Sequence, residues 1–87
     1  MPSILKPLEK PLTFFHSGGD IIWRGDGWCV PVTDFAEGLR DWYSKKADEA
    51  LRAQAWREEI AMHDLWKQLN DALRARKQWL RVVERAA

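Results

Sequence analysis

The sequence has little cysteine and no long apolar run. Cys29 is the single cysteine among 87 residues, so no intrachain disulfide can stabilise the fold. Cysteine and histidine do not cluster at the spacings of a structural zinc site. No stretch approaches the roughly 20 apolar residues of a membrane span, and the first residues do not have the pattern of a signal peptide. A single cysteine suits a reducing compartment, so we expect a cytoplasmic protein.

The chain also lacks an excess of charge of either sign. Fourteen basic and thirteen acidic residues give a net charge of +1, which excludes an acidic phosphate mimic and a uniformly basic nucleic-acid coat. The balance hides a gradient, because residues 34–60 sum to −2 and residues 61–87 to +3. A chain of this length buries only a modest core, so we expect self-association or a partner protein to support it.

The N-terminal residues are rich in proline. Prolines at positions 2, 7 and 11 remove backbone donors and favour extended geometry. We therefore expect an extended arm over residues 1–11, followed by one small domain over residues 12–87.

Three short segments after the arm have the composition of strands, with β-branched and aromatic residues between glycine-containing turns. These predicted strands are Leu12–His16, Ile21–Arg24 and Trp28–Val32. We expect an antiparallel meander in the order 1-2-3, because Pro31 cannot donate to a central ladder and suits an edge strand. Trp23 flanks the second turn opposite Trp28, so the two indoles are expected to contact each other.

The rest of the chain predicts helix. From Leu39 to Ala87 there is neither glycine nor proline, and strong helix formers dominate. We therefore expect an α+β fold with helix over residues 34–86. One long helix is favoured because no turn residue interrupts it. The alternative is a helical hairpin, with a turn at Ser44, at His63-Asp64 or at Asn70-Asp71.

A heptad-like seam follows the second half of this helical region, with one polar member. Its members are Met62, Trp66, Leu69, Leu73, Arg76, Leu80 and Val83. Three short strands cover only a few turns of a long helix, so another surface must cover the seam. That surface is a second copy, another protein, or the acidic half of the same chain folded back. We predict these protein-interface residues: Trp56, Met62, Trp66, Leu69, Leu73, Trp79, Leu80 and Val83.

No group of residues predicts a reaction. His16 and Cys29 lie on strands that are not neighbours in a meander, and Glu59 with His63 offers only two metal ligands. We therefore expect a non-enzymatic protein with no catalytic residue, metal or cofactor.

The strongest basic cluster of the chain lies near its C-terminus. It consists of Arg74, Arg76, Lys77, Arg81 and Arg85. Such a cluster indicates contact with nucleic acid or with an acidic protein surface. It also complements the dipole at a helix C-terminus.

We predict a protein-binding module, because apolar stripes and tryptophans on a long helix are typical of interfaces. In its size and general composition the chain is similar to small phage or mobile-element proteins, anti-CRISPR inhibitors among them. Proteins of this class dock on a host complex and block it. This similarity implies an inhibitor or adaptor that contacts a larger protein, or a homodimer. The alternatives are a nucleic-acid-binding accessory factor and a structural subunit of a larger assembly.

Overall fold

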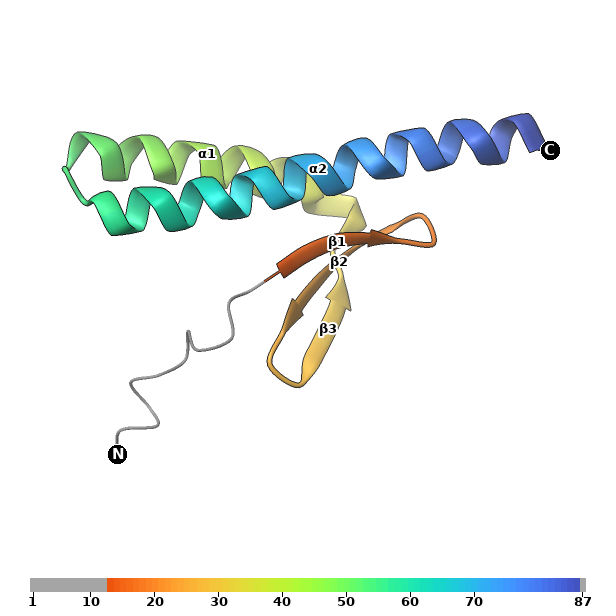
Figure 1. Ribbon diagram of the computed structural model, residues 1–87, viewed down its shortest axis with the longest axis horizontal. Helices are drawn as coiled ribbons and strands as arrows, with labels where there is room; N and C mark the ends of the chain where they lie inside the picture. Colours follow the sequence, from red (N-terminus) through yellow and green to blue (C-terminus); the bar gives the residue numbers. More distant parts are fainter. Residues whose placement is uncertain (1–12, 87) are drawn as a thin grey trace.

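A computed structural model describes residues 13–86, which form a small sheet followed by helices (Figure 1). The elements in chain order are β1 (Thr13–Ser17), β2 (Asp20–Gly25), β3 (Trp28–Pro31), the 3-10 helix η2 (Thr33–Phe35), α1 (Ala36–Arg52) and α2 (Trp56–Ala86). The predicted α+β class is confirmed. The predicted arm over residues 1–11 lies outside the described residues. No helix within residues 13–86 is long and apolar enough to cross a membrane.

The sheet is the predicted antiparallel meander, in the order β1-β2-β3. Two-residue turns join its strands, and Gly18 and Gly19 of the first turn have φ values of 57° and 92°. Glycine adopts this left-handed region without a side-chain clash, which is why these residues mark the turn. Trp23 and Trp28 meet edge to face with ring centroids 5.0 Å apart, as expected.

One face of the sheet packs against α2. Polar side chains form hydrogen bonds to backbone amides at two sides of the sheet. Gln68 of α2 accepts a hydrogen bond from the Phe14 amide, 2.9 Å away, at the free edge of β1. An edge amide satisfied in this way is not available to pair with another strand. On the other side, the hydroxyl of Thr33 accepts from the Ile21 amide and donates to Asp20, which fixes the chain as it leaves β3.

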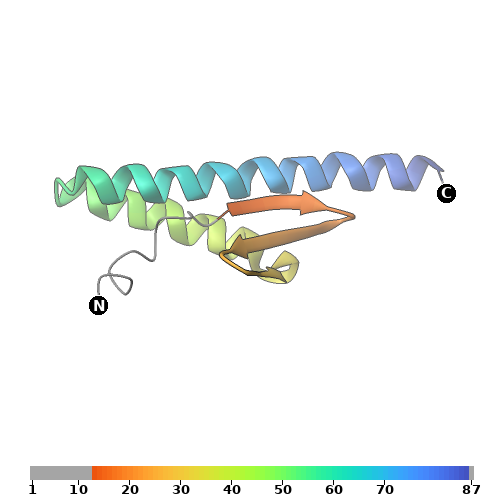
Figure 2. The ribbon, with the colours of Figure 1, turned by 60° about the horizontal axis from the view of Figure 1, so that its bottom comes forward.

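The helical region is a hairpin, so the expectation of one long helix was wrong. α1 and α2 lie side by side, and α2 lies directly above β1 in Figure 2. The turn falls at residues 53–55, not at any of the three sites that the sequence suggested. Gln54 takes the left-handed conformation with φ 58°. The amides of Gln54 and Ala55 donate to the carbonyls of Leu51 and Ala50, the hydrogen-bond pattern of a Schellman motif.

Small residues allow the two helices of the hairpin to approach closely. The buried alanines are Ala36, Ala47 and Ala50 on α1 and Ala72 on α2. The core also contains Phe14, Ile21 and Val32 of the sheet region, Tyr43 of α1 and Leu69 of α2. α2 has 31 residues and α1 only 17. At about 1.5 Å per residue, α2 therefore extends roughly 20 Å further than α1.

Candidate functional site

The first half of the predicted seam is covered within the chain. Leu69 is 0% exposed, and Met62, Trp66 and Leu73 are partly buried against the core cluster. α1 folds back along these four side chains. Leu69 is therefore removed from the predicted docking surface, whereas Met62, Trp66 and Leu73 stay partly exposed. Leu69 in particular has no surface to offer to a partner.

Arg76, the polar member of the seam, and Trp79 hold the first turn of the sheet. Arg76 Nε donates to the carbonyl oxygen of Gly19 over 2.6 Å. The Trp79 indole meets His16 edge to face at 5.8 Å. It lies so close to Gly19 that a Cβ atom there would be 2.6 Å from Trp79 Cζ3. The two residues thus bind the turn to α2, although the Trp79 side chain stays partly exposed.

Beyond Leu80, which lines a hollow with Glu37 and Arg40 of α1, α2 runs clear of the other described elements. We call residues 80–86 the α2 end, which projects past both α1 and the sheet in Figures 1 and 2. Leu80 is half-buried, whereas Val82 and Val83 are exposed. Of the predicted interface residues, Val83 therefore lies on an exposed segment, and Leu80 lies half-buried at its base. Trp56 is also exposed, but at the opposite, hairpin end of α2.

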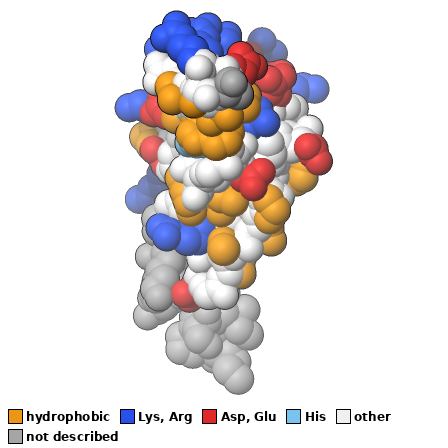
Figure 3. All heavy atoms as spheres, turned by 90° about the vertical axis from the view of Figure 1, so that its right-hand side faces the viewer, with side chains coloured by type: hydrophobic (Ala, Val, Ile, Leu, Met, Phe, Trp, Pro, Cys, Tyr) orange, Lys and Arg blue, Asp and Glu red, His pale blue; other side chains and the backbone are white. Residues whose placement is uncertain are grey.

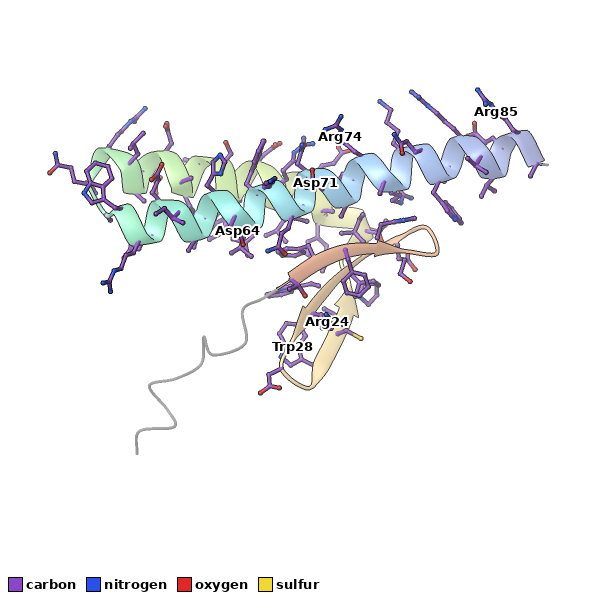
Figure 4. The ribbon with its side chains drawn as sticks, viewed as in Figure 1. Arg24, Trp28, Asp64, Asp71, Arg74 and Arg85 are labelled. Carbon is purple, nitrogen blue, oxygen red and sulfur yellow. The ribbon has the colours of Figure 1, made fainter. Side chains whose placement is uncertain are left out.

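Four of the five predicted cations share one side of α2. We call this set the basic row, and it consists of Arg74, Lys77, Arg81 and Arg85. Their spacing of 3, 4 and 4 residues places them along one side of a helix. Figure 4 shows Arg74 and Arg85 pointing away from the sheet. Arg76 does not belong to the row, because its side chain turns to Gly19.

The basic row is not neutralised by the described residues. Within residues 13–86, no ion pair joins these four cations to a carboxylate. Like charges three or four residues apart on a helix repel each other and lower its stability slightly. Cations near a helix C-terminus interact favourably with its dipole, which offsets part of this cost. The row is therefore a surface ready to bind negative charge.

A second exposed apolar surface lies on α1 and β3, and the sequence analysis did not identify it. Five aromatic rings are in successive contact, in the order Trp28, Trp23, Phe14, Tyr43 and Trp42. The middle rings are buried or half-buried, while Trp28 and Trp42 at the two ends are exposed. The apolar repeat of α1 was visible in the sequence, but it did not reveal that Tyr43 faces the core and Trp42 faces outward.

The polar candidates for chemistry do not assemble. His16 and Cys29 lie on opposite faces of the sheet and on strands that do not pair. His63 contacts the Trp66 ring at a centroid distance of 5.5 Å and lines a shallow groove with Glu59. No group of three metal-ligating side chains occurs among residues 13–86. Burial raises the pKa of the Tyr43 hydroxyl above its usual value of 10.0, which keeps this group neutral.

Comparison of the chain with protein-family models, with curated proteins and with solved structures finds no match.

Proposed function

We propose that the protein is a non-enzymatic binding module whose α2 end docks on a larger protein with an acidic surface. It acts there as an inhibitor or adaptor. The observation that carries the proposal is the length of α2. Its last turns add nothing to the core of the chain, yet they keep apolar side chains at Leu80, Val82 and Val83.

The α2 end is amphipathic in a way that suits a groove on a partner. Leu80 and Val83 continue the seam, whereas Arg81 and Arg85 continue the basic row on another side. Figure 3, which looks onto this end, shows Lys and Arg side chains gathered at one edge with hydrophobic side chains below them. A helix of this kind lays its apolar side into a groove and pairs its charges at the rim. The positive charge favours an acidic rim.

Trp79 strengthens this assignment because it is both exposed and held in place. Its ring is fixed by His16 and by the turn at Gly19. A tryptophan that is ordered before binding loses little side-chain entropy when a partner covers it. Buried aromatic anchors of this type dominate the binding energy of many interfaces.

Photo-crosslinking from two matched positions tests the proposal. A photoreactive amino acid replaces Val82 in one variant and Ile60 in the other, because these side chains are 65% and 66% exposed and both lie on α2. In cell lysate we expect a discrete protein adduct from position 82 that excess unlabelled wild-type protein removes. Position 60 is expected to give none. Equal adducts from both positions, or none from position 82, would contradict the proposal.

The basic row favours nucleic acid as a second candidate ligand. Four cations on one side of a helix, with no carboxylate partner among residues 13–86, can contact successive phosphates. If nucleic acid is the ligand, the logarithm of the affinity for duplex DNA should fall with the logarithm of salt concentration with a slope of about −3.6. Lys77→Glu with Arg81→Glu should abolish this binding. Arg76 is left unchanged, because it holds Gly19. Absence of binding at low salt removes this candidate.

A further inference from the structure

The outer side of α1 carries a short apolar stripe, of which only Leu39 also packs against the core. We call it the α1 stripe, and it consists of Phe35, Gly38, Leu39 and Trp42. Phe35 is 56% and Trp42 48% exposed. The four residues line a shallow groove of about 470 Å³ with Tyr43 on its inner side. Gly38, Leu39 and Trp42 share one side of α1, and Phe35, the last residue of η2, lines the same groove.

We propose that the α1 stripe binds the α1 stripe of a second copy, with the two helices antiparallel and crossing at Gly38. This is a different surface from the α2 end, so the inference goes beyond the proposed function and does not depend on it. The argument rests on the symmetry of the stripe, on its flanking charges and on the glycine.

The stripe is self-complementary in the antiparallel direction. An aromatic residue stands at each end, Phe35 and Trp42, seven residues or about 10 Å apart along the helix. A two-fold axis midway between Gly38 and Leu39 places Phe35 of each copy opposite Trp42 of the other. A two-fold contact uses the same patch on both subunits, so it needs a patch with this property.

The charges beside the stripe select the same direction. Asp34 precedes the stripe, and Lys45 follows it. Both side chains are exposed. Asp34 lies in η2 just before α1, and Lys45 lies on α1 beyond Trp42, so the two opposite charges stand at opposite ends of the stripe. In the antiparallel arrangement Asp34 of one copy approaches Lys45 of the other, whereas parallel helices would bring like charges together. Pairs at a rim set orientation more than affinity.

Gly38 is the residue that the fold of a single chain does not explain. Its φ is not positive, and a Cβ atom built on it would meet nothing within 4 Å. Glycine inside a helix lowers helix stability relative to alanine. A glycine at a helix crossing lets the second helix approach closely, since the distance between helix axes depends on the side chains at the contact.

The size of the stripe predicts a weak dimer. A Phe or Trp side chain buries about 150–250 Å² when it is fully covered, and here about half of each ring is already buried. The contact therefore lies at the low end of specific interfaces, with an expected Kd on the order of 100 µM.

Sedimentation equilibrium from about 10 µM to about 1 mM protein tests the dimer over this range of affinity. The wild-type chain should pass from monomer to dimer. Gly38→Gln should raise the Kd at least tenfold, because its side chain blocks the crossing. The same change should raise the Tm by about 4 °C, since glutamine is the better helix former. Ser44→Gln is the matched control, because Ser44 is exposed on the other side of α1. It should leave the Kd unchanged.

A charge exchange tests the direction of the helices. Asp34→Lys alone should weaken the dimer, and Asp34→Lys combined with Lys45→Asp should restore it. A wild-type chain that stays monomeric at 1 mM would overturn the inference. So would a dimer that Gly38→Gln leaves intact and Val83→Asp dissociates, because such a dimer would use the α2 end.

Discussion

The two halves of α2 share an apolar spacing but have different surroundings. Residues 56–73 lie against α1 and, in part, against β1, and Leu69 in this half is fully buried. Residues 74–86 contact the sheet through Arg76 and Trp79 and then project from the molecule. The same apolar spacing runs through both halves. In the first half it builds the core, and in the second half it leaves apolar side chains exposed.

This difference shows what a periodic pattern can and cannot indicate. A heptad-like repeat indicates that one side of a helix is apolar and needs a cover. It does not indicate which segment supplies the cover. α1 supplies it for residues 62–73, and 17 residues are not enough to reach Val83. We therefore assign the fold to the first half, and the proposed binding surface lies on the second.

The largest expected effect is a difference in the free energy of unfolding between a substitution in the first half of α2 and one in the second half. Leu69→Ala leaves a cavity in the core and should lower the free energy of unfolding by about 2–5 kcal/mol. Val82→Ala removes an exposed side chain and should change it by less than about 0.5 kcal/mol. Urea unfolding followed by circular dichroism measures both. Similar values for the two variants would mean that the α2 end is part of the folding core.

A smaller loss of stability tests the contact between Trp79 of α2 and Gly19 in the first turn of the sheet. Gly19→Ala forces a left-handed alanine and a clash with Trp79. Gly18→Ala forces a similar conformation in open space. The left-handed region alone costs about 1–2 kcal/mol, so Gly19→Ala should lower stability by a further ~1 kcal/mol or more. Equal losses from both substitutions would show that the Trp79 indole does not press on the turn.

Alkaline pH should lower the free energy of unfolding by a still smaller amount, through Tyr43 in the core. The raised pKa of Tyr43 means that the folded state holds this proton more tightly than the unfolded state. The contribution of Tyr43 is thus fully present below about pH 10 and is lost as the pH rises through its folded pKa. Tyr43→Phe should remove this loss. Unfolding free energies of both proteins between pH 8 and 11 test it, and parallel curves would contradict it.

The sheet could be predicted from the sequence because its signals are local. The turns at Gly18-Gly19 and Asp26-Gly27 fixed where the strands begin and end to within one or two residues. Pro31 correctly indicated an edge strand. Each of these features depends on the backbone preferences of one or two residues, so no distant contact was needed to read them.

The helical hairpin could not be predicted in the same way. Its turn contains no glycine, and Gln54 adopts a left-handed conformation that costs about 1–2 kcal/mol in a non-glycine residue. Packing of α1 on α2 offsets this cost. Ala47 and Ala50 looked like gaps in the apolar pattern of the sequence, yet they are the buried residues that allow the close approach.

The candidate surfaces were predicted only in part. Val83 lies on the exposed α2 end, as the seam suggested, with Leu80 half-buried at its base, whereas Leu69 belongs to the core. Trp42 and Tyr43 are adjacent aromatic residues of the apolar repeat, and the sequence does not indicate which of them faces the core. One residue along a helix turns a side chain by about 100°, so neighbours cannot both face the core.

The most direct test of the division of α2 uses Val83→Asp protein as a competitor in the crosslinking from position 82. Val83 is exposed, so this variant should unfold at the same urea concentration as the wild type. We predict that it competes for the partner at least tenfold less well than the wild type. Equal competition by the two proteins would contradict the account, because the α2 end would then not be the binding surface.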